Sequence, residues 1–383
     1  MTVVAPTARS SRKRRPRWAP VPVLPRAPVV RQWLLVIYQE RKAMEDLRIA
    51  TIGTSMITGQ FLEAVGLVDG ITFAGAYSRS LEKAEEWSRA HGADRAWDSL
   101  DALAADDSVD AVYIASPNLL HAEQALKMIG GGKHVLVEKP LGTTRAEARR
   151  VFEAAREKGV VAMEAMRLVH DPAWRVVAEN LHFLGTLRRA SFPYGKYSSR
   201  YDKVLAGEQT NIFDPAFATG ALMDIGIYPL NALVLMLGEP DDLMCFADTV
   251  DVTGDGGTID LCGTVLFDYP DAVATVSYSK VTDDRLPAQI EGEKGTMIVD
   301  SVPQPRRIEV FYGDGSSQVL PVPGRKNRTD HEVGNMEFEV ADFLAACRGE
   351  LSLERLNENT LAVIGIMDTV RLREGIVFPH DEG

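Results

Sequence analysis

The chain has 383 residues, with 42 Lys and Arg against 54 Asp and Glu, and its formal net charge at pH 7 is -12. Ten of the basic residues but only one acid lie in residues 1–43, so the remainder carries 32 basic and 53 acidic side chains, a net charge of -21. A body this acidic argues against nucleic-acid binding, and its length allows for about two domains.

Residues 1–43 are basic and contain six prolines. An export signal needs an uninterrupted apolar segment after its basic residues, and prolines and arginines break up residues 20–31. We therefore expect a disordered extension, with the fold beginning at Met44.

The three cysteines, Cys245, Cys262 and Cys347, are isolated, odd in number and without CxxC spacing. They indicate reduced thiols of a cytoplasmic protein, with neither a disulfide framework nor a metal site. No apolar run approaches the roughly eighteen residues of a membrane span, so we expect no membrane partner.

From residue 48 to 164, apolar strand-like segments alternate with amphipathic helical segments. Strands are expected at 48–52, 71–77, 95–97, 111–115, 134–137 and 160–164. Helices are expected at 57–65, 81–90 and 100–105, before the Gly130–Gly132 stop, and from a Thr144/Glu147 capping box to Gly159. The alternation predicts an α/β, Rossmann-type doubly wound parallel sheet spanning 44–166.

The second half, 167–383, has a different pattern. Six strand-like segments are expected at 186–192, 243–250, 263–268, 272–279, 288–291 and 296–299, several separated by hairpin-like turns. Helices are expected after Asp171-Pro172, at 221–237, at 336–347 and at 357–373. Consecutive strands predict an α+β domain with a large, mainly antiparallel sheet.

The first strand meets its helix at Gly53-Thr54-Ser55-Met56-Ile57-Thr58. In a Gly-x-Gly-x-x-Gly fingerprint, the glycines allow a tight turn and the approach of a pyrophosphate to the helix N-terminus. Here Ser55 and Thr58 replace the second and third glycines. The motif is consistent either with an altered nucleotide-binding turn or with an ordinary strand-to-helix turn capped by Ser or Thr.

The second strand ends at Tyr77-Ser78-Arg79-Ser80, where an NAD site usually places an acid on the ribose hydroxyls. A hydroxyl and a guanidinium suit a 2′-phosphate better. This favours NADP over NAD, unless Arg79 merely lies on a solvated helix start.

The strand at 134–137 leads into Glu138-Lys139-Pro140, at the edge where open α/β sheets bind ligands. The Lys139 ammonium could stabilise an alkoxide as hydride leaves a substrate. The alternative is an ordinary surface ion pair.

Residues 220–229 read Gly-Ala-Leu-Met-Asp-Ile-Gly-Ile-Tyr-Pro. Asp224 and Tyr228 are four apart, so a helix would place them on one face. They form either a satisfied buried pair or, if they face Lys139, a group that passes a proton to or from a substrate oxygen.

In combination, these motifs resemble the glucose-fructose oxidoreductase/inositol dehydrogenase (Gfo/Idh/MocA) family. The resemblance covers 46–378 and includes the corner Ala115-Ser116-Pro117-Asn118 with His121. Most such enzymes have histidine where this chain has Tyr228, which is similar to the branch of dimeric dihydrodiol dehydrogenases and NADP-dependent D-xylose dehydrogenases.

The resemblance implies that Lys139 and Tyr228 are catalytic and that Asp224 orients the substrate. The cofactor residues that it implies are Gly53, Thr54, Ser55, Met56, Ile57, Ser78, Arg79, Ser116, Pro117, Asn118, His121, Glu138 and Lys139. The expected substrate-binding residues are Arg167, Lys196, Asn211, Asp224 and Tyr228. It also implies that the domain at 167–383 binds substrate and forms oligomers, with its final helix packed back on the first domain. Pairing would use the outer face of the second sheet, as a homodimer or homotetramer.

We therefore predict a cytoplasmic oxidoreductase that moves hydride between NADP, or possibly NAD, and a carbinol carbon of a sugar, polyol or diol. Two alternatives stay open: a glycosidase that uses tightly held NAD for transient oxidation, and a non-catalytic NADP-sensing regulator. The combination of Lys139, Asp224 and Tyr228 argues against the regulator, which has no need of proton-handling groups.

Overall fold

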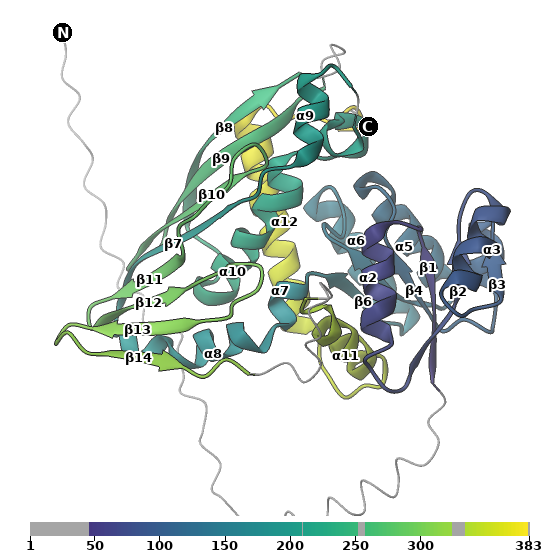
Figure 1. Ribbon diagram of the computed structural model, residues 1–383, viewed down its shortest axis with the longest axis horizontal. Helices are drawn as coiled ribbons and strands as arrows, with labels where there is room; N and C mark the ends of the chain where they lie inside the picture. The colour runs from purple at the N-terminus through teal and green to yellow at the C-terminus, as the bar shows by residue number, and fades with distance from the viewer. Residues whose placement is uncertain (1–45, 209, 252–256, 324–333, 382–383) are drawn as a thin grey trace, which may run out of the picture. The chain divides into compact units, whose positions relative to one another are not determined.

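The computed structural model describes residues 46–208, 210–251, 257–323 and 334–381. The extension predicted at residues 1–43, and the predicted start at Met44, lie outside the described residues. The chain from Asp46 onward belongs to one compact unit, in which each half of the chain builds one sheet (Figure 1).

The first half contains six parallel strands with helices between them. Their order is β3-β2-β1-β4-β5-β6, and they comprise β1 (Leu47–Ile52), β2 (Ile71–Tyr77), β3 (Arg95–Trp97), β4 (Ala111–Ile114), β5 (His134–Glu138) and β6 (Ala162–Ala165). The helices are α2 (Met56–Val65), α3 (Leu81–Ala90), α4 (Leu100–Ala105), α5 (His121–Gly130) and α6 (Arg145–Lys158). This order is that of a Rossmann fold, whose ligand crevice lies where the strand order reverses, between β1 and β4.

The wholly apolar strands are buried on both faces, which explains their sequence. In β4, Val112 and Ile114 belong to one hydrophobic cluster, and Ala111 and Tyr113 belong to another on the opposite face. Alternate residues of a strand point to opposite faces, so both faces need apolar side chains. Thr144 caps α6, since the Glu147 amide donates to its hydroxyl over 3.2 Å. The Glu147 carboxylate accepts from the amide and hydroxyl of Thr143, so only one half of the predicted capping box is present.

The second half contains an eight-stranded sheet in the order β14-β13-β12-β11-β7-β10-β9-β8. The strands are β7 (Leu187–Gly195), β8 (Asp242–Val250), β9 (Ile259–Asp268), β10 (Val273–Ser279), β11 (Ala288–Gly292), β12 (Gly295–Val299), β13 (Ile308–Tyr312) and β14 (Ser317–Leu320). All neighbours are antiparallel except β7 and β10, so the predicted fold class is confirmed. The last two strands are additional to the six that the pattern identified.

The helices of the second half include several short turns. They are α7 (Arg167–His170), α8 (Pro172–Asn180), η2 (Leu181–Leu184), α9 (Ser199–Leu205), η3 (Asn211–Phe213), η4 (Pro215–Phe217), η5 (Leu222–Gly226), α10 (Ile227–Leu237), α11 (Met336–Cys347) and α12 (Glu354–Glu374). The sequence predicts one continuous helix at 221–237, but its first turn, η5, is a π-helix. Such wide turns are frequent at functional sites.

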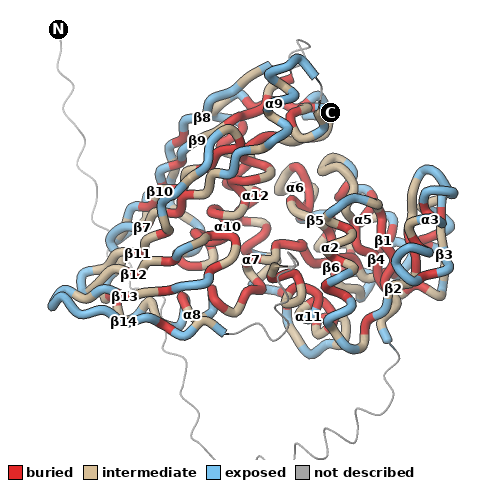
Figure 2. The backbone as a smooth tube through the Cα atoms, in the orientation of Figure 1, coloured by how far each residue is buried: buried red, intermediate tan, exposed pale blue. Residues whose placement is uncertain are grey.

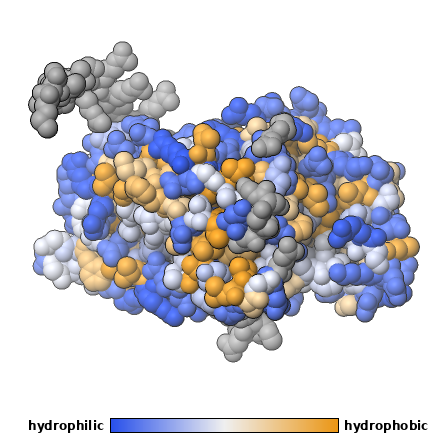
Figure 3. Space-filling model, turned by 90° about the horizontal axis from the view of Figure 1, so that it is seen from above, coloured by the Kyte–Doolittle hydropathy of each residue, from blue (hydrophilic) through white to orange (hydrophobic). Residues whose placement is uncertain are grey.

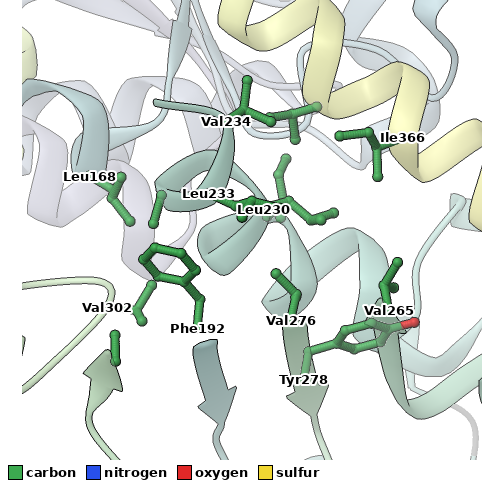
Figure 4. Packing of buried hydrophobic residues seen from close by; sticks show 14 of the residues in the cluster. Leu168, Phe192, Leu230, Leu233, Val234, Val265, Val276, Tyr278, Val302 and Ile366 are labelled. Atoms are coloured by element: carbon green, nitrogen blue, oxygen red, sulfur yellow. The ribbon is translucent and has the colours of Figure 1, made fainter. Parts of the chain in front are cut away.

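The inner face of the eight-stranded sheet packs on α10. Figure 4 shows Phe192 of β7 and Val276 of β10 pointing toward Leu230 and Leu233 of that helix, with Ile366 of α12 beyond it. The helical stretch Pro215–Leu237 is long and apolar enough to cross a membrane by composition, but 78% of its apolar window is buried inside the protein. It is the core helix of this sheet.

Helix α12 joins the two halves and is buried along much of its length (Figure 2). The Thr360 hydroxyl donates to the Glu164 carboxylate at the end of β6 over 3.0 Å, and Asn359 donates to Asn231 of α10 over 2.6 Å. Burial raises the pKa of Glu164 to about 7. Helix α11 also contacts the first half, because Met336, Val340 and Phe343 belong to the cluster beneath Tyr113.

Candidate active site

The predicted cofactor residues lie in the turns that follow β1, β2, β4 and β5. Because parallel strands end at one edge of the sheet, these turns form a single rim. Gly53 has a φ of +113°, and a Cβ at this position would lie 2.7 Å from the Ala115 carbonyl oxygen. The first fingerprint glycine is thus required by the close approach of the β1 and β4 turns.

The two replaced glycines leave the turn open to a phosphate. Thr58 is buried, and its hydroxyl accepts the Ser55 amide proton over 3.4 Å. Ser55 and Met56 are exposed at the start of α2, whereas Thr54 and Ile57 are half-buried. An exposed helix N-terminus attracts anions through its free amides, so the turn fits a dinucleotide pyrophosphate.

The turn after β2 carries Ser78 and Arg79. Ser80 begins α3, and its hydroxyl accepts the amide proton of Lys83 over 3.4 Å. The Arg79 side chain is exposed and forms no ion pair with any described residue. Its guanidinium is therefore available to a ligand at this edge.

The corner after β4 is held by main-chain carbonyls. Both ring nitrogens of buried His121 lie near carbonyl oxygens, Nδ1 at 2.8 Å from Pro140 and Nε2 at 2.7 Å from Ser116. Burial lowers the pKa of this imidazole, and the neutral ring donates only one proton. His121 therefore links the corner at Ser116 and Pro117 to the turn after β5.

Two contacts tie this rim to its surroundings. Asn118 Nδ2 donates to the Ala218 carbonyl oxygen over 2.8 Å, which joins the corner to the second half of the chain. Ala218 has a φ of +53°, a conformation that costs energy for a residue with a Cβ. At the end of β5, Glu138 accepts the Tyr113 hydroxyl proton over 2.5 Å.

Lys139 and Asp224 come from different halves of the chain and form an ion pair in which the two side chains are 14% and 27% exposed. Lys139 Nζ lies 2.6 Å from Asp224 Oδ1 and 3.0 Å from the Asp224 main-chain oxygen. Burial opposes ionisation of Asp224, but the charges of Lys139 and Lys280 outweigh it and hold the pKa of this carboxyl far below its usual range. Burial likewise opposes the charge of Lys139, but Asp224 raises the pKa of this ammonium above its usual value.

Tyr228 lies beside this pair. Its ring centroid is 5.3 Å from Lys139 Nζ and 5.6 Å from the ring centroid of Tyr194, which it meets edge-on. Burial raises the pKa of Tyr194 to about 12. The structure thus brings Lys139, Asp224 and Tyr228 together at the carboxyl edge of the first sheet, as their motifs suggested.

The π-turn that carries Asp224 is anchored at its start. The Leu222 amide donates to Asp260 Oδ2 over 2.8 Å, and a Cβ on Gly220 would lie 2.5 Å from the other oxygen of Asp260. Burial raises the pKa of Asp260 to about 6. This contact fixes the direction from which Asp224 enters the crevice.

The other expected substrate residues are less closely associated. Arg167 is half-buried, and although burial opposes its charge, Tyr228, Glu339 and Glu138 raise the pKa of its guanidinium. Lys196 and Asn211 are exposed, and neither side chain bonds to Lys139, Asp224 or Tyr228 within the described ranges. Residues 199–205, between these two positions, form α9.

Sequence reasoning missed Lys280, which donates to Asp224 Oδ2 from the end of β10. The only signal was a lysine directly after an apolar strand, which is common. It also missed buried Glu339 of α11, both of whose oxygens have no hydrogen-bond partner among the described residues. Within those residues no group of three His, Cys, Asp or Glu could hold a metal ion.

Comparison with known proteins gives consistent matches over most of the chain. Residues 47–166 match the family model described as an oxidoreductase family with an NAD-binding Rossmann fold, GFO/IDH/MocA, and residues 182–298 match the GFO/IDH/MocA C-terminal domain. The chain is 37% identical over 338 residues to scyllo-inositol 2-dehydrogenase (NADP(+)) IolU of Bacillus subtilis, a match that covers 88% of this chain and 99% of that protein.

Two further relatives match over similar lengths. Trans-1,2-dihydrobenzene-1,2-diol dehydrogenase of Oryctolagus cuniculus is 29% identical over 345 residues, which cover 86% of this chain and 99% of that protein. The crystal structure of KijD10, a 3-ketoreductase from Actinomadura kijaniata, in complex with NADP and TDP-benzene matches with a TM-score of 0.71 at 26% identity, covering 86% of this chain and 98% of that one.

Proposed function

Because this chain belongs to the GFO/IDH/MocA oxidoreductase family, as its motifs predicted, we propose that it transfers hydride between NADP and a carbinol or carbonyl carbon of a sugar, polyol or trans-dihydrodiol. The observation that carries the proposal is the meeting of Lys139, Asp224 and Tyr228 beside the nucleotide rim. The relatives that act on scyllo-inositol and on a dihydrobenzene diol support this substrate class.

The rim residues fit a nicotinamide dinucleotide. The open turn at Gly53 and the start of α2 would hold its pyrophosphate, and Ser78 and Arg79 would hold the 2′-phosphate that distinguishes NADP from NAD. Glu138 and the corner at Ser116–Asn118 would line the remainder. When bound, the nicotinamide supplies the carbon that accepts or donates hydride.

The side chains of this protein would handle the accompanying proton. Oxidation of an alcohol releases a proton from its hydroxyl, and Tyr228 would accept it; reduction would require Tyr228 to return it. The Lys139 ammonium would stabilise the negative charge on the phenol or substrate oxygen at that moment. Asp224 would hold Lys139 in place and orient the substrate, with Arg167 near the same groups.

The cofactor assignment predicts the outcome of a titration. Arg79→Ala is expected to weaken NADPH binding by about tenfold or more, the loss of one charge-assisted contact to phosphate, and to leave NADH binding unchanged. Cofactor fluorescence measures both affinities, and Glu82→Ala in the first turn of the following helix, α3, serves as a surface control. Equal loss for both nucleotides, or no loss for either, would argue against a 2′-phosphate site at Arg79.

The same protein distinguishes the alternatives. Turnover of scyllo-inositol or trans-1,2-dihydrobenzene-1,2-diol with NADP supports the dehydrogenase. Retention of NAD through gel filtration together with cleavage of aryl glycosides would favour the glycosidase instead. Tight NADPH binding without turnover of any polyol, sugar or diol would favour the regulator.

We further propose a homodimer or homotetramer built through the outer face of the eight-stranded sheet. Met244, Phe246, Leu266 and Val273 are 46–71% exposed, and the strand register places them on one side, opposite the buried face. Hydrophobic residues also form patches among hydrophilic ones in the view of Figure 3. A contiguous exposed apolar face on a sheet is typical of an interface between subunits.

The interface proposal predicts that Phe246→Asp combined with Leu266→Asp yields a monomer. Two buried, unpaired carboxylates would oppose association by several kcal/mol, and NADPH affinity should not change. Analytical ultracentrifugation of wild type and variant measures this, with Leu372→Asp as the control because that leucine is 84% exposed on α12. A monomeric wild type would contradict the proposal.

We also place the enzyme in the cytoplasm. Support comes from its three cysteines, which are free, because disulfides are rare in reducing compartments. Cell fractionation tests this location directly.

A further inference from the structure

Lys280 is a buried lysine in the crevice whose role the motifs do not explain. Its side chain is 3% exposed and donates to Asp224 Oδ2, while its ammonium lies 5.7 Å from the ring centroid of Phe213. Its main chain is fixed on both sides, because its amide donates to the Leu261 carbonyl over 3.0 Å and its carbonyl accepts from the Ser198 amide over 2.9 Å. The ammonium is therefore held in one place.

The charges around Asp224 do not balance. Oδ1 accepts from Lys139 and Oδ2 accepts from Lys280, so one carboxylate serves two ammoniums and the cluster of these three groups, taken by itself, has a net charge of +1. Burying an ammonium is costly unless a counter-charge compensates it. A purely structural ion pair needs one lysine, so the second one calls for another explanation.

We propose that Lys280 is a positioning residue for hydride transfer: by pairing with Asp224, it leaves the positive charge of Lys139 available to Tyr228 and to the substrate oxygen. Without Lys280, the Asp224 carboxylate would neutralise Lys139 alone, and the field at Tyr228 would weaken. Lys280 also holds Asp224 Oδ2, and this orients Asp224 Oδ1 toward Lys139. This inference rests on the proposed dehydrogenase function.

The groups that face this cluster come from every neighbouring element. Burial lowers the pKa of Lys280, and the nearby charges of Lys139 and Arg200 act in the same direction against the attraction of Asp224. A positive charge held in a poorly solvated site stabilises negative charge that develops on a nearby oxygen during the reaction. The charged or titratable groups around it are Tyr113 of β4, His121 of α5, Glu138 and Lys139 at the end of β5, Glu164 of β6, Arg167 of α7, Tyr194 of β7, Arg200 of α9, Asp224 of η5 and Tyr228 of α10.

Three variants of the full-length protein test the proposal. Lys280→Met removes the charge but keeps an unbranched apolar stem, and Lys280→Arg keeps the charge. Lys133→Met is the matched control, because Lys133 is also buried but bonds to the Asp106 carbonyl, away from the crevice. If Lys280→Met fails to fold, Lys280→Gln keeps a hydrogen-bond donor to Asp224 without the charge.

The main readout is the pH profile of kcat/KM with scyllo-inositol and NADP. For Lys280→Met we expect the midpoint of the pH profile to move to higher pH by about one unit and kcat to fall by about tenfold, with KM changed less. Lys280→Arg should restore the midpoint, and Lys133→Met should not move it. NADPH affinity should be the same in all variants.

A second readout needs no substrate. Ultraviolet absorbance of the phenolate, taken as the difference between each protein and its Tyr228→Phe version, follows Tyr228 directly. An unmoved midpoint in Lys280→Met by this titration would overturn the proposal, as would an equal shift in Lys133→Met. Failure of wild-type protein to bind NADPH or turn over any polyol would contradict the proposed function instead, and the phenolate titration would still decide the role of Lys280.

Discussion

Tyr228→Phe is expected to lower kcat by about 10²- to 10⁴-fold, the usual contribution of a positioned general acid or base. The substitution removes only the hydroxyl, so the ring keeps its edge contact with Tyr194 and its place beside Lys139. Affinity for NADPH should stay at the wild-type value, because the phenol would act on the substrate and not on the nucleotide. Steady-state kinetics and a cofactor titration measure the two quantities separately.

Tyr194→Phe is the matched control for that experiment. The two tyrosines face one another at 5.6 Å between ring centroids, so both substitutions remove one hydroxyl from the same crevice. Tyr194 is partly buried and has no proton-transfer role in the proposed scheme. A comparable loss in both variants would indicate a general disturbance of the crevice and would contradict a specific role for Tyr228.

Lys139→Met provides the second arm of a double-mutant cycle. If Lys139 acts by stabilising negative charge on Tyr228 or the substrate oxygen, Lys139→Met should have a smaller effect in a protein that already carries Tyr228→Phe. The double variant should then lose much less than the product of the two single losses, as groups that work as a unit do. Fully multiplicative losses would show that the two residues act independently.

Much of the site follows from local sequence because it is built from strand ends. The apolar run at residues 111–115, the helix that follows it and the strand at 134–137 define a parallel unit, and any charge directly after such a strand lies on the ligand edge. Lys139 is predictable on this basis. Gly53 is too, because only glycine tolerates both its positive φ and its approach to Ala115.

The parts of the site that the sequence does not predict depend on contacts between residues far apart in the chain. Lys280 reaches Asp224 only because β10 pairs in parallel with β7 within an otherwise antiparallel sheet, and no local pattern encodes that pairing. The π-turn at Leu222–Gly226 depends on a buried carboxylate, Asp260, on a neighbouring strand. Helix propensity alone predicts an unbroken helix there, and tertiary contacts override it.

Asp224→Asn is expected to be among the most destabilising single changes in the crevice. The amide is nearly isosteric with the carboxylate, but it leaves the ammoniums of Lys139 and Lys280 buried without a counter-charge. Breaking a buried ion pair by removing one partner typically costs about 3–5 kcal/mol of unfolding free energy, and the like charges of two adjacent lysines add to it. Urea unfolding of wild type and variant at pH 7 measures the difference.

The difference should depend on pH in a defined direction. The pKa of Asp224 lies below its ordinary value of 3.8 in the folded protein, so its contribution to stability is complete above that value and is lost as pH falls through the range below it. The difference in unfolding free energy between wild type and Asp224→Asn should therefore be largest near neutral pH and should become smaller in acid. A gap that grows in acid would contradict the assignment of Asp224 as the ionised partner.

Removing one lysine should restore part of the unfolding free energy that Asp224→Asn loses. In Asp224→Asn combined with Lys280→Met, only the Lys139 ammonium remains without a counter-charge, and the net charge of the cluster falls from +2 to +1. The part of the stability loss that comes from repulsion between the two lysines and from the unpaired Lys280 should be recovered. The recovery separates charge imbalance from any packing defect caused by asparagine, since the second change relieves only the former. If the double variant is no more stable than Asp224→Asn alone, the two lysines do not share Asp224 in solution, and the crevice holds Lys139 by other contacts.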